Sequence, residues 1–60
     1  MENAAQNVRK ARLIAAQSLR SRAARYRGIG AECYNQNLAI EVETVVRELD
    51  TAAASLESMN

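Results

Sequence analysis

Few residues in this chain have the chemistry that catalysis or metal binding requires. Its 60 residues include one cysteine, Cys33, and no histidine. A thiol nucleophile needs a base beside it, and no obvious base accompanies Cys33. One cysteine without histidine also excludes the usual zinc site and a disulfide within one chain. We therefore expect no metal site here and no catalytic use of the thiol.

The acidic residues offer one further arrangement. Glu41 and Glu48 are seven residues apart, so they share one face of a helix. Bundles that bind two metal ions between carboxylates also use a Glu-x-x-His motif, which this chain lacks. Carboxylates beside a heptad pattern are ordinary solvated flanks. The sequence therefore predicts a protein that is not an enzyme and has no catalytic residues.

The two glycines lie close together, in Gly28-Ile29-Gly30. A dinucleotide-binding loop has a third glycine and follows a strand, and a P-loop continues into Gly-Lys-Ser/Thr. Neither pattern is present, so we expect no cofactor. Glycine is also favoured just after a helix, where a left-handed residue is needed. The three residues thus predict a turn.

The composition favours helix on both sides of that turn. The chain is rich in alanine and has no proline, and its only glycines are those of the turn. Asn3 and Gln6 match a capping box, so a first helix is expected over about 3–27. The turn occupies 28–30, and a second helix follows over about 31–58. An alternative start for the second helix lies nearer Asn37, because the run Asn35-Gln36-Asn37, with its two asparagines, is a poor helix interior.

Apolar residues in both segments recur in steps of three and four, which is the spacing of a helix seam. If the chain folds back at Ile29, Arg12 lies near Val46 and Arg22 faces Gln36. The seam expected in the second segment comprises Leu38, Val42, Val45, Leu49, Ala52, Leu56 and Met59, with Ala39, Val46 and Ala53 on its flank. The seam expected in the first comprises Ala5, Val8, Arg12, Ala15, Leu19, Arg22 and Tyr26.

The predicted fold is all-α, a single helical-hairpin domain over 1–60. A hairpin of two helices cannot cover all of Val46, Ile40, Leu13 and Ile14, so we expect a homodimer of hairpins that forms a four-helix bundle. Leu13 or Ile14 would lie near the dimer interface. The residues expected to contact the second copy or another partner are Leu13, Ile14, Leu19, Ile40, Val42, Val45, Val46, Leu49 and Leu56.

The charges are divided between the two halves. Residues 1–27 hold seven basic side chains and one acidic one, whereas residues 28–60 hold six acidic and one basic. Either the halves neutralise each other side by side, or the basic half binds nucleic acid. A pI of about 7.9 favours neutralisation, because nucleic-acid modules usually exceed 9. Arg9, Arg20 and Arg27 share one helix face and are the candidate phosphate contacts.

These features indicate a small regulator that binds a larger protein through a helix face and modulates it, as accessory factors of phages and plasmids do. The alternative is a nucleic-acid-binding regulator. In its layout the hairpin resembles the RNA-binding Rop-type plasmid regulators, which implies RNA contacts along the arginine face. A third option is a structural subunit of a larger assembly. With no apolar run for a membrane span or signal peptide, we expect a cytoplasmic protein.

Overall fold

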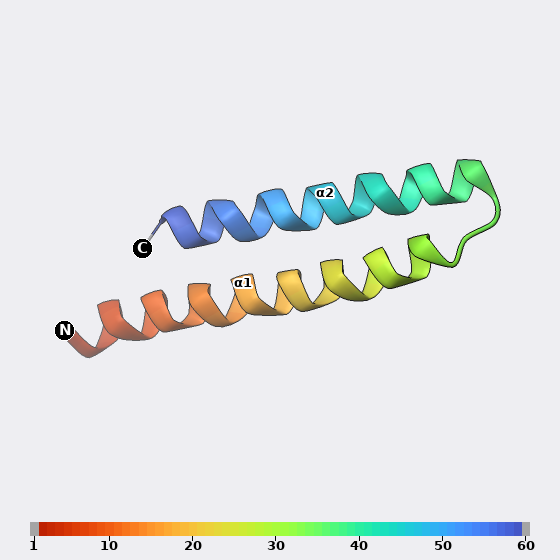
Figure 1. Ribbon diagram of the computed structural model, residues 1–60. Coiled ribbons are helices and arrows are strands. Elements are labelled where there is room, and N and C mark those ends of the chain that lie inside the picture. Colours follow the sequence, from red (N-terminus) through yellow and green to blue (C-terminus); the bar gives the residue numbers. More distant parts are fainter. Residues whose placement is uncertain (1, 60) are drawn as a thin grey trace.

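The chain forms two long helices that lie side by side in opposite directions. The computed structural model describes residues 2–59, in which α1 spans Glu2–Ala31 and α2 spans Gln36–Ser58 (Figure 1). The Cα atoms extend over 52 × 14 × 10 Å, so the molecule is a narrow, two-helix slab. The predicted all-α helical hairpin is confirmed.

The predicted Gly-Ile-Gly turn is wrong. Gly28 and Gly30 both lie within α1, and neither has a positive φ. The connection is the segment 32–35, and α2 begins at Gln36, close to the later of the two expected starts. The amides of Glu32 and Cys33 close the end of α1 by donating to the carbonyls three residues earlier, each at 3.1 Å.

Asn35 explains why the second helix starts so late. Its side-chain oxygen accepts hydrogen bonds from the backbone N–H of Asn37 at 3.0 Å and of Leu38 at 3.2 Å. These amides are among the four that a helix start leaves without partners, and capping them is worth about 1 kcal/mol. A glycine within a helix costs a similar amount, about 1 kcal/mol. Because these two local free energies are similar, they do not determine the position of the turn. Packing of the two helices determines it.

The later turn changes which residues face each other. Gly30 lies against Val42 near the turn, and at the other end the Arg12 guanidinium donates to the carbonyl oxygen of Met59 at 3.3 Å. The expected neighbours, Arg12 with Val46 and Arg22 with Gln36, are therefore wrong. Because Arg12 already reaches Met59, the N-terminal turns of α1 extend past α2 (Figure 1).

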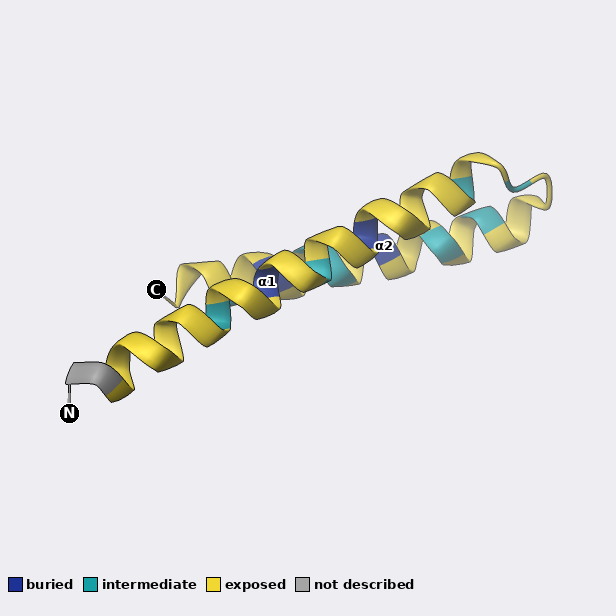
Figure 2. Cartoon of the chain, turned by 90° about the horizontal axis from the view of Figure 1, so that it is seen from below, coloured by how far each residue is buried: buried dark blue, intermediate teal, exposed yellow. Residues whose placement is uncertain are grey.

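The hairpin core is made of small side chains. Ala16, Ala23, Val46 and Ala53 are buried, and they lie along the line where the helices meet (Figure 2). The half-buried residues are Arg12, Leu19, Gly30, Cys33, Ala39, Val42, Leu49, Asp50 and Leu56. The seam of α2 is thus centred on Val46 and Ala53, which the sequence placed on its flank. Alanine carries one methyl group, so it lets the two backbones approach closely.

Candidate functional site

The hairpin has two broad faces, which differ in chemistry. In each helix the core positions recur every seven residues, as at Ala16 and Ala23 in α1 and at Val46 and Ala53 in α2. The positions that flank the core on either side recur at the same interval. Because the helices are antiparallel, equivalent flanks of the two helices meet on the same face. We call one the charged face and define it by Arg20, Arg27, Glu43, Arg47, Asp50 and Glu57. We call the other the apolar face and define it by Val8, Ala15, Arg22, Ile29, Leu38, Val45, Ala52 and Met59.

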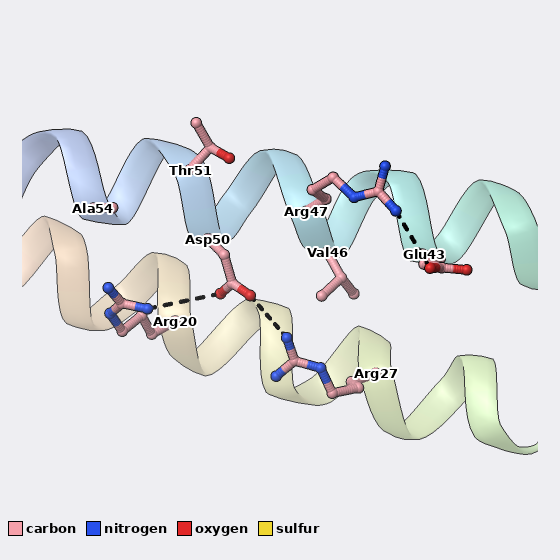
Figure 3. Close-up of a pocket in the computed structure, with 8 residues that line it drawn as sticks. All are labelled: Arg20, Arg27, Glu43, Val46, Arg47, Asp50, Thr51 and Ala54. Atoms are coloured by element: carbon pink, nitrogen blue, oxygen red, sulfur yellow. Dashed lines mark hydrogen bonds and ion pairs between the residues drawn. The ribbon is translucent and has the colours of Figure 1, made fainter.

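Ion pairs join the two helices on the charged face. Asp50 lies between two arginines, with Oδ2 at 2.7 Å from Arg27 Nη2 and Oδ1 at 3.9 Å from Arg20 Nη1 (Figure 3). Arg20 also contacts Glu57, with Nε 3.1 Å from Oε1. Along α2, Arg47 pairs with Glu43 one helical turn away at 3.3 Å. The basic half of the sequence is thus partly neutralised by the acidic half.

The electrostatic effect of this arrangement is seen at Arg20. The hydrogen bond to Glu57, followed by the negative charge of the same carboxylate, raises the pKa of the Arg20 guanidinium above its ordinary value. A raised pKa means that this contribution to stability, which needs the ionised Glu57 carboxylate, is lost on the alkaline side only in strong alkali. The arginine therefore keeps its charge throughout the physiological range.

A shallow hollow of about 610 Å³ lies over these ion pairs (Figure 3). It is lined by Arg20, Arg27, Glu43, Val46, Arg47, Asp50, Thr51 and Ala54. Its three guanidinium groups face three carboxylates, those of Glu43 and Asp50 in the lining and that of Glu57 beside it, so the hollow has little net charge to attract an anion. The predicted arginine stripe is affected in the same way, since Arg20 and Arg27 pair with acids of α2. Arg9 lies on the part of α1 that extends past α2.

The apolar face leaves large side chains in solvent. Exposed fractions there are 50% for Val8 and Ile29, 49% for Leu38, 40% for Val45 and 60% for Met59. In an isolated two-helix coil the positions on both flanks are usually charged, because both face water. Here one flank is mainly charged and the other mainly apolar along both helices, with Leu13 and Arg22 as the exceptions in α1. Helices that carry a third apolar row in this way are typical of larger bundles.

The residues predicted as interface divide into three groups. Val46 is buried in the hairpin itself, and Leu19, Val42, Leu49 and Leu56 are half-buried between the helices. Val45 lies on the apolar face. Leu13, Ile14 and Ile40 are exposed by 44%, 58% and 55%, and their heptad positions place them away from the apolar face, toward the charged face or the outer surface.

Sequence reasoning missed Ile29 and used Leu38 only as a seam residue. Ile29 was assigned to the turn, whereas it lies in α1 and continues the row of Val8, Ala15 and Arg22. The signal was present in the spacing, because six members of this face each directly precede a core position: Ala15, Arg22, Ile29, Leu38, Val45 and Ala52. It could be recognised only once the core positions were known.

Other kinds of site are not found in the part of the chain that the structure describes. Within residues 2–59 no three His, Cys, Asp or Glu side chains lie close enough together to hold a metal ion. The same residues contain no helix with the length and hydrophobicity needed to cross a membrane. Comparison with protein-family models, with curated proteins and with solved structures finds no match to this chain.

Proposed function

We propose that this protein is a non-enzymatic regulator that acts in the cytoplasm and that its apolar face is a protein-binding surface. The observation that carries the proposal is the difference between the two faces. One face satisfies its charges within the hairpin, whereas the other exposes Val8, Ile29, Leu38, Val45 and Met59. Exposed apolar patches of this kind mark sites of interaction with proteins, membranes or ligands.

The form of the apolar face suggests how a partner would be recognised. Its rows repeat every seven residues, which is about 10.5 Å along a helix at roughly 1.5 Å per residue. A helix of the partner that lies along the apolar face would present its own side chains at the same interval. This is the helix-face mode of recognition, in which apolar anchors supply the affinity.

RNA or DNA binding has less support. It would use Arg9, Arg20 and Arg27, and two of these guanidinium groups contact carboxylates of α2. Phosphates would have to displace Asp50 and Glu57, or bind beside them against their negative charge. The ion pairs thus favour the protein-binding proposal.

A site-specific photo-crosslinker tests the proposal. We would place the crosslinking residue at Val45, and in a matched variant at Ile14, which is similarly exposed but lies off the apolar face. The expected result is one dominant crosslinked protein from position 45 in the native cell and none from position 14. The identified protein would then be purified and its binding measured with and without Val45→Asp. Equal crosslinking from both positions would contradict the proposal.

A further inference from the structure

We infer that the protein bound by the apolar face is a second copy of this chain, stacked so that α1 of each copy lies over α2 of the other. This inference rests on the proposed function, since it names the partner of the same face. The result would be a four-helix bundle in which neighbouring helices are antiparallel. The interface differs from that expected from the sequence, because Leu13 and Ile14 lie off it.

The size of the face is suited to such a dimer. The slab is 52 Å long and 14 Å wide between Cα atoms. The outline of a broad face is therefore about 700 Å², which is of the same order as the roughly 800 Å² of accessible surface that each partner contributes to a standard interface. This outline includes the end of α1 that extends past α2. The residues that would become covered include Ile29, Leu38 and Val45, each at least 40% exposed in the single hairpin. Half-buried Leu49 and Leu56 at the base of the face would be covered with them.

The charges beside the apolar face select how two copies stack. On the α1 side these charges are basic, with Arg22 in the apolar row and Arg25 one turn outward. On the α2 side they are acidic, with Glu41 and Glu48. Stacking α1 over α2 of the second copy therefore brings opposite charges together. Stacking α1 over α1 would set arginine against arginine and glutamate against glutamate, which disfavours that arrangement.

The register of the hairpin places Arg25 and Glu48 at nearly the same height along the helix axes. Gly30 lies opposite Val42, and α1 and α2 run in opposite directions. Arg25, five residues before Gly30, is therefore nearly level with Glu48, six residues after Val42. Rotation about a two-fold axis parallel to the helices leaves the height of each residue along the axis unchanged. Arg25 of each copy therefore lies beside Glu48 of the other copy, which gives two such pairs in the dimer.

Charge exchange tests both the partner and the arrangement. We would measure the dimer dissociation constant of the full chain, with reductant present, by sedimentation and by native mass spectrometry. Arg25→Glu and Glu48→Arg should each weaken the dimer about tenfold, because each variant turns two surface attractions into two repulsions. The double variant should return to within about threefold of the original. Lys10→Glu, which changes the same charge away from the face, is the matched control.

The outcomes separate the inference from the proposed function. A dimer that both single variants weaken and the double variant restores supports the inference, provided that circular dichroism shows unchanged helix content. A dimer insensitive to these exchanges and to Val45→Asp would overturn it. A monomer at all concentrations that still crosslinks to another protein from position 45 would overturn the inference and leave the proposed function standing. A monomer without such a crosslink would overturn both.

Discussion

Gly30 in α1 lies directly against Val42 in α2, so closely that a Cβ built on Gly30 would be 3.0 Å from Val42 Cγ1. The same construction at Gly28 meets nothing within 4 Å. The two glycines are therefore not equivalent, although only one residue separates them. Gly30 serves the contact between the helices, whereas Gly28 faces open space.

The two glycines should respond oppositely to alanine. We expect Gly28→Ala to raise the free energy of unfolding by about 0.5–1 kcal/mol, because alanine is the better helix former and has room. Gly30→Ala should lower it by about 1 kcal/mol or more, since Val42 is β-branched and cannot easily turn aside. Urea unfolding followed by circular dichroism measures both. Stabilisation by both variants would contradict the close contact at Gly30.

Asn35 should be the most sensitive residue of the connection. Asn35→Ala removes the acceptor of the Asn37 and Leu38 amides and should cost about 1 kcal/mol. Asn35→Asp keeps an acceptor and should cost much less. Thermal unfolding compares the two variants, and Asn37→Ala is the control for loss of an asparagine. A hairpin that tolerates Asn35→Ala as well as Asn37→Ala would not depend on this cap.

The buried alanines set the distance between the helices. Ala23 is completely buried, and leucine there should force α1 and α2 apart at a cost of about 1–3 kcal/mol. Ala24→Leu, at the next and exposed position, is the control and should be nearly neutral. The measurement is again the free energy of unfolding. Similar tolerance of leucine at both positions would mean that the helices are not packed as closely here as the structure shows.

The ion pairs of the charged face should contribute modestly and in a salt-dependent way. Asp50→Asn removes the carboxylate that two arginines share, but these side chains are partly exposed. We expect a loss of less than about 1 kcal/mol at low ionic strength, which shrinks further in about 1 M salt because exposed charges are screened. Unfolding of Asp50→Asn and of the control Glu32→Gln at both salt concentrations measures the effect. A large loss that salt does not change would contradict this explanation.

Much of the architecture follows from local sequence features. The absence of proline, the abundance of alanine and the three-four spacing of apolar residues indicate two helices, because these signals act within a few residues of each other. The opposite charges of the two halves also indicate that the halves lie together. Arg20 with Glu57 and Arg27 with Asp50 bear this out.

The position of the turn could not be derived in this way. Gly28 and Gly30 resemble a helix end by residue type, and the amide-capping Asn35 is an equally good signal seven residues past Gly28. The position of the turn depends on which use of Gly30 gives the lower free energy. It could end the first helix as a turn residue, or it could stay in α1 and allow close approach to Val42. That comparison involves atoms from both helices, so only the tertiary structure decides it.

The choice of the core row has the same physical origin. In α2 the row of Leu38, Val45 and Ala52 and the row of Ala39, Val46 and Ala53 are both apolar, and the sequence alone favours the larger side chains. Packing against Ala16 and Ala23 instead selects the row with two alanines, because small side chains on both helices allow close contact. The spacing of apolar residues was thus determined by the sequence. The fit between the surfaces of α1 and α2 decided which of these apolar residues are buried in the hairpin and which stay exposed for a partner.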